Sequence, residues 1–304
     1  MNQVMPCEIP VIAIVGPTAV GKTKLSVELA KALDGEIINA DSTQIFKGLD
    51  IATAKVTEPE KEGIPHHLFD LKDITEDYTV YDYQKDSRAM IDKIREKHKV
   101  PILVGGTGLY LKACLYDYQF QAETSHEQYE TLTNEELYQM LLRVDPATTI
   151  HPNNRKRVIR AYRYYLETGQ PFSQKPKTET LLYPVIMIGL TTDRLVLYER
   201  INQRVDVMLS QGLLPEAEKI YQSQIRTKAV MTPIGYKELF PYFAREASLG
   251  DCLDQIRKNS RHYAKRQYTW FQNQMKVTWF DVNFDHFQTT VHEVLTYIQK
   301  KRFD

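Results

Sequence analysis

The segment that decides the fold is Val11-Ile12-Ala13-Ile14-Val15-Gly16-Pro17-Thr18-Ala19-Val20-Gly21-Lys22-Thr23. It opens with an apolar, largely β-branched run, which predicts a buried strand. The pattern G-x-x-x-x-G-K-T follows at Gly16–Thr23, and a helix-like stretch, Lys24 to Leu33, comes next. In such a phosphate loop, backbone N–H groups turn toward phosphate oxygens at a helix N-terminus, and the lysine reaches the terminal phosphate. The sequence therefore predicts a di- or triphosphate site, with the Thr23 hydroxyl as a ligand of Mg²⁺.

Composition limits what else the chain can be. Its 304 residues are 42% hydrophobic, its net charge is zero, and it has three cysteines, which are far apart in the sequence. We expect no disulfide framework and no cysteine-based zinc site, and therefore a reducing cytoplasm. No apolar stretch approaches the length of a membrane span, and no basic segment precedes Ile9–Val15 as a signal peptide would require. A neutral protein cannot coat nucleic acid through overall charge, so any polyanion must be met locally.

The order of predicted elements indicates an α/β fold. Strands are predicted at Val11–Val15, Glu36–Ala40 and Val100–Val104, with helices at Gly21–Leu33 and Tyr81–His98 between them. Strands that alternate with helices form parallel sheets with covering helices. We therefore predict a P-loop-type parallel sheet with flanking helices, which a strand within Tyr183–Leu190 rejoins. Helices are expected to fill the rest of the chain.

A small helical insertion domain is predicted at residues 117–182. Residues 117–142 contain no Lys or Arg, whereas residues 151–163 carry five basic residues and no acidic one. Helical spacing dominates both stretches. We therefore divide the chain into residues 1–116, the first part of the core, residues 117–182, the insertion, and residues 183–304, the second part of the core with basic and aromatic helices.

Candidate chemical groups follow two other predicted strands. Asp41 comes after the second strand, and Gly105-Gly106-Thr107-Gly108 ends the strand at Val100–Val104. Parallel strands end at the same edge of a sheet, where such folds bind ligands, so both segments should lie beside the phosphate loop. Asp41 could hold Mg²⁺ through water or accept a proton, although an Asx turn or helix cap explains it about as well. Likewise, the glycines either allow close approach of a ligand or form an ordinary turn.

Basic residues gather in two tracts, residues 155–163 and 257–266. In the second, Arg257, Arg261 and Lys265 share one helical stripe, and aromatic residues are interleaved. Such a surface can hold the phosphates and bases of a single-stranded RNA loop, whereas a plain solvated helix face is the alternative. Arg200 and Arg204 could similarly present guanidinium groups to a pyrophosphate or pair with Glu199 or Asp206 along their helix. We interpret His66-His67 as loop residues.

Seven blocks in order resemble the signatures of the tRNA dimethylallyltransferase family, and together they span nearly the whole chain. The blocks are Gly16–Thr23, Asp41–Gln44, Ile64–Leu68, Gly105–Tyr110, Ile150–Asn153, Ile234–Glu238 and Tyr263–Phe271. The resemblance implies transfer of the dimethylallyl group of dimethylallyl diphosphate to N6 of the adenosine 3′-adjacent to the anticodon, in tRNAs reading codons that begin with U. It also implies that Mg²⁺ is needed and that the partner is the tRNA anticodon stem-loop. We expect a monomer with no membrane association.

The resemblance also assigns roles to residues. It implies that Asp41 takes the proton from N6, that Thr107 helps hold the adenosine, and that Lys22 stabilises charge on the departing pyrophosphate. Diphosphate binding falls to the loop and one arginine: Gly16, Pro17, Thr18, Ala19, Val20, Gly21, Lys22, Thr23 and Arg204. The implied tRNA contacts are Asp41, Ser42, Thr43, Gln44, Thr107, Lys156, Arg157, Val158, Ile159, Arg160, Lys265 and Arg266.

Two other classes of function remain open at this stage. A small-molecule or nucleoside kinase uses the same loop to move a γ-phosphoryl group. However, the strand Ile102-Leu103-Val104 runs into glycine, where a nucleotide hydrolase would carry an aspartate. The other alternative is an RNA-binding module without catalysis.

Overall fold

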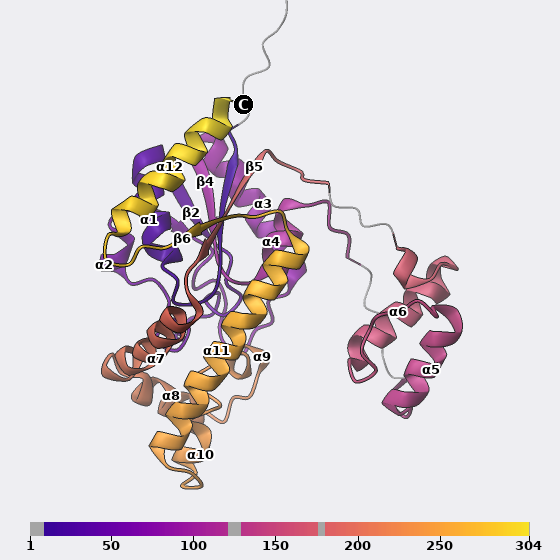
Figure 1. Cartoon of the computed structure of the whole chain (residues 1–304). Helices are drawn as coiled ribbons and strands as arrows, with labels where there is room; N and C mark the ends of the chain where they lie inside the picture. The colour runs from indigo at the N-terminus through magenta and orange to yellow at the C-terminus, as the bar shows by residue number, and fades with distance from the viewer. Residues whose placement is uncertain (1–8, 121–128, 176–179, 304) are drawn as a thin grey trace, which may run out of the picture. The chain divides into compact units, whose positions relative to one another are not determined.

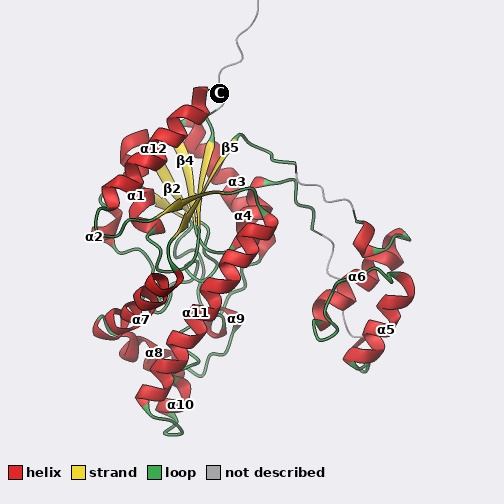
Figure 2. Cartoon of the chain, in the orientation of Figure 1, coloured by secondary structure: helices red, strands yellow, loops and turns green. Residues whose placement is uncertain are grey.

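The protein is built on a parallel β-sheet of six strands in a computed structural model that describes residues 9–120, 129–175 and 180–303 (Figures 1 and 2). The strand order is β3-β2-β4-β1-β5-β6, and all neighbours are parallel. The chain divides into two compact units, one comprising Met1–Asp117 with Leu181–Asp304 and the other Tyr118–Thr180. The predicted P-loop-type α/β fold with flanking helices is therefore confirmed.

The strands and helices have the following bounds in chain order: β1 Val11–Val15, α1 Lys22–Leu33, β2 Gly35–Asn39, α2 Glu58–Lys61, β3 His66–His67, α3 Val80–Glu96, β4 Val100–Val104, α4 Gly108–Leu115, α5 Asn134–Val144, α6 Arg155–Thr168, the 3₁₀-helix η2 Phe172–Gln174, β5 Val185–Thr191, α7 Arg194–Ser210, α8 Leu213–Gln222, α9 Lys228–Met231, α10 Phe240–Phe243, α11 Leu249–Gln274, β6 Thr278–Asp281 and α12 Phe287–Phe303.

Strand β1 lies at the centre of the sheet because its residues are apolar on both faces. All five of its side chains have no exposed surface, and they pair with β4 on one side and β5 on the other. Alternate residues enter two hydrophobic clusters: Ala13 faces the one that α3 and α4 cover, and Ile14 faces the one that α1 and α12 cover. Figure 1 shows these two helix pairs on opposite sides of the sheet. Burial on both faces is what a near-continuous apolar strand predicts.

Two strands differ from the sequence-based expectation. The segment Thr278–Asp281, expected to be helical, forms the edge strand β6 beside β5. The pair His66-His67, expected in a loop, forms β3 at the other edge, where His67 Nε2 lies 2.7 Å from Glu36 Oε2. Both are short edge strands. They are too short to show an alternating hydrophobic pattern in the sequence, and they form by pairing with a neighbouring strand.

The second unit, Tyr118–Thr180, has a small core of its own. It contains α5, α6 and η2, and its buried cluster includes Leu137, Leu141 and Val158. Helix α5 begins with a capping box between Thr133 and Glu136. In the described ranges, no helix of either unit is long and apolar enough to cross a membrane.

Candidate active site

The phosphate loop joins β1 to α1 through backbone conformations that need glycine. Gly16 has φ 141° and Gly21 has φ 99°, both outside the range that side chains favour. A Cβ on Gly16 would lie 2.7 Å from the carbonyl oxygen of Leu190 on β5, so the loop packs directly on its neighbouring strand. Gly21 is the N-cap of α1 and supplies no side-chain cap. The first N–H groups of α1 therefore face an anion site rather than a capping side chain.

Three charged groups converge on this loop. Lys22 Nζ donates to the carbonyl oxygen of Pro17 at 2.6 Å, and Arg204 Nη1 donates to Thr18 Oγ1 at 3.1 Å. Burial lowers the pKa of Lys22 to about 7, Asp41 opposes that shift, and Arg204 adds to it. Burial also lowers the pKa of Arg204, again against the pull of Asp41. Lys22, Arg200 and Arg204 thus outnumber the two carboxylates that act on them, Asp41 and Glu60, and a bound anion would relieve the excess of positive charge.

Arg200 and Arg204 of α7 both reach the phosphate loop. Arg200 Nε donates to the Ala19 carbonyl oxygen at 3.2 Å, and its guanidinium stacks over Phe284 at 3.7 Å. The alternative of pairing along the helix is wrong, because Asp206 pairs with Arg257 and Glu199 accepts from Gln203. Arg204, the residue predicted to bind the diphosphate, is the arginine whose pKa responds to Asp41.

Asp41 lies at the carboxyl edge of the sheet, two residues beyond β2. Its Oδ1 atom accepts from Thr43 N at 3.0 Å and from Thr43 Oγ1 at 2.7 Å, which is an Asx turn. The Asn39 side chain stabilises this loop, because its Oδ1 accepts from Asp41 N and its Nδ2 donates to the Leu68 carbonyl oxygen. Among the described residues, no hydrogen bond reaches the other oxygen, Oδ2. The turn interpretation and the chemical one are therefore compatible, because one oxygen makes the turn and the other stays available.

Thr107 meets the Asp41 loop directly. Its backbone N donates to the Ala40 carbonyl oxygen at 3.2 Å, and its Oγ1 accepts from Ser42 N at 3.0 Å. Gly105 permits this approach, since a Cβ there would lie 2.1 Å from the Ala40 oxygen. The fourth residue of the Asp41–Gln44 block faces inward, where Gln44 Nε2 donates to the carbonyls of Thr53 and Ala54. The structure thus brings Asp41, Ser42 and Thr107 together beside the phosphate loop.

The structure also places at this site Gln267, which was given no role from the sequence, and two aromatic residues that were expected on an RNA-binding face. Gln267 of α11 is buried and bonds to both the phosphate loop and the Gly105–Gly108 turn. Burial and the nearby Asp41 raise the pKa of Tyr263, one turn earlier, and the side chains of Thr107 and Gln267 oppose that rise. Trp270 packs where a Cβ on Gly108 would be, 2.0 Å from its ring. The spacing 263, 267, 270 is an inward helical stripe, and it was the available signal.

The basic stripe of α11 separates into two parts. Arg257 pairs with Asp206 and Asp254, and Arg261 donates to Asn202, so this part faces α7 rather than an open surface. Lys265 and Arg266 are exposed, and the guanidinium of Arg266 lies over the Tyr263 ring at 5.7 Å. Only the second part of the predicted RNA-binding stripe is therefore open to a polyanion.

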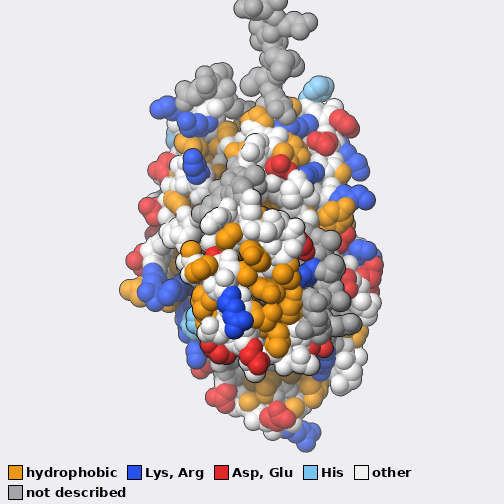
Figure 3. All heavy atoms as spheres, turned by 90° about the vertical axis from the view of Figure 1, so that its right-hand side faces the viewer, with side chains coloured by type: hydrophobic (Ala, Val, Ile, Leu, Met, Phe, Trp, Pro, Cys, Tyr) orange, Lys and Arg blue, Asp and Glu red, His pale blue; other side chains and the backbone are white. Residues whose placement is uncertain are grey.

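The basic tract of the second unit also has an inner and an outer side. Val158 and Ile159 are 0% and 5% exposed in the core of that unit, so their side chains are not offered to a ligand. Arg155 also points inward and donates to the Leu132 carbonyl. Lys156, Arg157 and Arg160 are exposed. The face of the chain drawn in Figure 3 mixes basic, acidic and hydrophobic side chains and is not continuously basic, as the net charge of zero leads one to expect.

Comparison with known proteins decides which family this arrangement belongs to. Residues 44–274 match the IPP transferase family. The chain belongs to the IPP transferase family. It is 49% identical over 300 residues to the tRNA dimethylallyltransferase of Anoxybacillus flavithermus, covering 96% of each chain. The resemblance found in the sequence blocks is thereby confirmed.

Solved structures of IPP transferase relatives show the same fold. The full-length tRNA isopentenylpyrophosphate transferase of Bacillus halodurans is 42% identical, with a TM-score of 0.75 and 97% of each chain covered. A eukaryotic dimethylallyltransferase acting on tRNA is 32% identical, with a TM-score of 0.77, covering 90% of this chain and 73% of that one. The agreement extends over both units of the chain.

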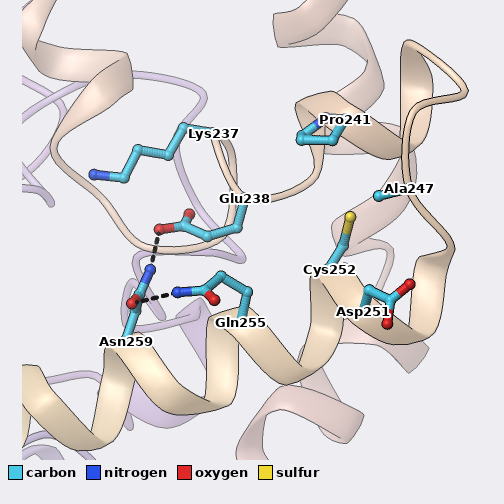
Figure 4. A pocket seen from close by; sticks show the side chains of 8 residues that line it. All are labelled: Lys237, Glu238, Pro241, Ala247, Asp251, Cys252, Gln255 and Asn259. Atoms are coloured by element: carbon cyan, nitrogen blue, oxygen red, sulfur yellow. Dashed lines mark hydrogen bonds between the residues drawn. The ribbon is translucent and has the colours of Figure 1, made fainter.

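One signature block of the IPP transferase family, Ile234–Glu238, lies away from the phosphate loop. Glu238 accepts from Gly235 N at 2.9 Å and from Asn259 Nδ2 at 2.9 Å, as Figure 4 shows for the second bond. Glu238 and Asn259 border a hollow of about 410 Å³ beside α11, and none of the predicted site residues lines it. We conclude that this block ties the first half of α11 to the core.

The phosphate loop offers one candidate protein ligand for a magnesium ion. Thr23 is exposed at the first turn of α1, and the described part of the chain holds no group of three or more His, Cys, Asp or Glu side chains that forms a metal cage. Mg²⁺ is commonly held by one or two protein oxygens together with phosphate oxygens and water. The donor set of this IPP transferase family member suits that arrangement, with Thr23 as the protein ligand.

Proposed function

We propose that the protein transfers the dimethylallyl group of dimethylallyl diphosphate to N6 of the adenosine 3′-adjacent to the anticodon, in tRNAs that read codons beginning with U, and releases pyrophosphate. The observation that carries the proposal is the position of Asp41, whose free oxygen lies in the field of Lys22 and Arg204 at an uncapped phosphate loop. An anion site and a proton acceptor at one edge of a sheet suit a reaction in which a diphosphate leaves while a nucleophile loses a proton.

The phosphate loop would grip the leaving group. The bond that breaks joins oxygen to the allylic carbon, so negative charge develops on an intact diphosphate and no water has to attack phosphorus. N–H groups of the Gly16–Thr23 loop, Lys22 and Arg204 would stabilise that charge. Thr23 would help to hold Mg²⁺ at this loop, and the ion would supply further stabilisation of that charge. This explains why an aspartate at the end of β4 is dispensable.

Asp41 would accept the proton of the nucleophile. An exocyclic adenine amine is a weak nucleophile because its lone pair is delocalised into the ring, so orientation and a nearby carboxylate count for more than a strong base. Thr43 fixes one oxygen of Asp41, and the other would receive the N6 proton as the new carbon–nitrogen bond forms. Thr107 and Ser42 would hold the adenosine at this position.

The tRNA would be gripped by exposed cations of both units. Lys265 and Arg266 of α11, together with Lys156, Arg157 and Arg160 of α6, are available for phosphates. The target base must leave its stack to reach the diphosphate, and the Asp41–Gln44 loop would receive it. We further propose that the protein acts as a monomer in a reducing cytoplasm, since its three cysteines are too few and too scattered for a disulfide framework.

Nucleoside mass spectrometry tests this function. Unmodified tRNA is incubated with the protein and Mg²⁺, in one reaction with dimethylallyl diphosphate and in a second with ATP. We expect adenosine carrying one dimethylallyl group in the first reaction only, with one pyrophosphate released per modified tRNA. Phosphate transfer from ATP without prenylation would instead support a kinase, and RNA binding without either product would support a non-catalytic module.

A further inference from the structure

Gln267 is a buried polar residue on a helix whose neighbouring positions are solvated. Its side chain is 5% exposed, whereas Lys265 and Arg266 beside it are exposed. A buried amide needs both its donor and its acceptor satisfied, so its partners define what it does. Both partners belong to the loops that form the candidate site.

The Gln267 amide joins two loops that are far apart in the sequence. Its Oε1 atom accepts from Thr18 N of the phosphate loop at 2.9 Å, and its Nε2 atom donates to the Gly106 carbonyl oxygen at 3.2 Å. A Cβ on Gly106 would lie 1.9 Å from Nε2, so the turn after β4 is closely fitted around this amide. A primary amide presents one donor end and one acceptor end, and the carboxylate of glutamate cannot make both bonds.

The turn that Gln267 holds is also bonded to the loop of Asp41. Thr107, next to Gly106, donates its backbone N–H to the Ala40 carbonyl oxygen at 3.2 Å, and its Oγ1 accepts from Ser42 N at 3.0 Å. Hydrogen bonds therefore connect the diphosphate side of the site, through Gln267 and the Gly105–Gly108 turn, to the adenosine side. Tyr263 of α11 lies beside this turn, where the Thr107 and Gln267 side chains oppose the rise in its pKa that burial causes.

Helix α11 itself is anchored elsewhere. Asn259 donates to Glu238 (Figure 4), Arg257 pairs with Asp206, and Arg261 donates to Asn202 at 2.7 Å. None of these bonds involves Gln267. Truncating the Gln267 side chain therefore removes the link between the loops and leaves the helix attached to the core.

We propose that Gln267 is a positioning residue that sets the separation between the diphosphate and the adenosine in the reactive complex. The inference rests on the proposed function, because it concerns how two substrates are aligned. Each loop keeps its own bonds when Gln267 is removed, so each substrate still binds. The two then meet with poorer alignment, and small misplacements of reacting atoms cost large factors in rate.

The test compares Gln267→Ala and Gln267→Glu with Gln272→Ala, the same truncation at an exposed position of the same helix. We measure kcat and the KM for each substrate. Gln267→Ala should lower kcat by about 10–100-fold and change either KM by less than about 3-fold. Gln267→Glu should lose at least as much, because it cannot donate to the Gly106 carbonyl and brings a negative charge near the diphosphate. Gln272→Ala should match the unmodified protein.

A second variant keeps the proposal open to refutation if Gln267→Ala does not fold. Tyr263→Phe removes a single hydroxyl beside Gln267 and Thr107 and should also lower kcat rather than raise KM. Combined with a folded Gln267 variant, it should cost less than the product of the two single effects, because the two side chains support the same turn. Unchanged kcat in the folded variants, or a loss confined to KM, would overturn the positioning role. An unmodified protein that does not prenylate tRNA would instead overturn the proposed function.

Discussion

The two ends of the parallel sheet differ in how far their buried charges are paired within the protein. Near the amino end, Glu36 of β2 is 3% exposed, hydrogen bonds with His67 Nε2 at 2.7 Å and forms an ion pair with Lys97 Nζ at 3.0 Å. Burial alone would raise the pKa of Glu36, but these hydrogen bonds outweigh it and hold the pKa below its usual value. At the carboxyl end, Lys22 and Arg204 share Asp41 and remain short of negative charge.

This contrast separates stability from function. A buried carboxylate with several cationic partners is satisfied within the protein and has nothing left for a ligand. The carboxyl end instead keeps cations without a matching number of anions and a carboxylate with one oxygen uncommitted. It is incomplete by itself, and a diphosphate with a proton-releasing amine would complete it.

The largest effect on turnover is expected from Asp41→Ala. Turnover should fall by about 10² to 10⁴-fold because the proton acceptor is lost, while tRNA affinity holds. Single-turnover prenylation and filter binding measure the two quantities. Glu36→Gln, at the other end of the sheet, is the matched control and should leave turnover unchanged. Equal losses in both variants would show that the two ends do not differ in function.

A smaller effect is expected from the exposed cations of α6. The triple variant Lys156→Ala, Arg157→Ala, Arg160→Ala should weaken tRNA binding by about 10–100-fold at low salt. The slope of log binding constant against log salt concentration should become shallower by roughly 0.7–0.9 for each phosphate that the protein no longer binds. Binding titrations at several salt concentrations measure the slope. Lys93→Ala, exposed on α3, is the control, and an unaltered slope in the triple variant would remove α6 from the RNA-binding surface.

The pH dependence of diphosphate binding tests whether Lys22 lacks a negatively charged partner in the free protein. Lys22 has a pKa of about 7 in the free protein, and an anion beside it must raise that pKa. Binding at pH 8 should therefore take up protons, and affinity should fall by up to about tenfold per pH unit above 7. Calorimetry of pyrophosphate binding in buffers with different ionisation heats measures the uptake. Lys22→Met should lack the proton uptake that is due to Lys22. Identical proton uptake in both proteins would contradict the role of Lys22.

Replacement of Glu36 should have the smallest effect on function and should instead lower the stability of the fold. Glu36→Ala should lower the free energy of unfolding by about 1–3 kcal/mol at pH 7, because buried hydrogen bonds are removed. The folded pKa of Glu36 lies below its unfolded value, so its contribution is complete above about pH 4.5 and disappears as pH falls through the folded pKa. Urea unfolding at pH 7 and pH 3.5 checks this. A difference that persists undiminished at pH 3.5 would argue against the ion pairs.

The sequence predicted the parts of the site that are set by local pattern. The phosphate loop has a fixed spacing, and Asp41 and Thr107 meet because parallel strands end at one edge. The bounds of β1 and β4 follow from apolar runs that stop at glycine. Such features need no knowledge of distant contacts.

The remainder depends on long-range packing that no local pattern encodes. Gln267 acts on Thr18, which lies 249 residues away along the chain. Arg257 was expected on an open stripe and instead pairs with Asp206 of a different helix. Val158 and Ile159 sit within a basic tract but fill the core of the second unit. In each case the outcome is decided by which helix face meets a neighbour, and the spacing alone leaves that choice open.

The decisive experiment is a crystal structure with an unreactive dimethylallyl diphosphate analogue and an anticodon stem-loop. We expect the diphosphate within the Gly16–Thr23 loop and the extruded adenine N6 at hydrogen-bond distance, about 2.6–3.2 Å, from Asp41 Oδ2. An Asp41 carboxylate engaged only with Thr43, with the adenine bound elsewhere on the protein, would contradict it.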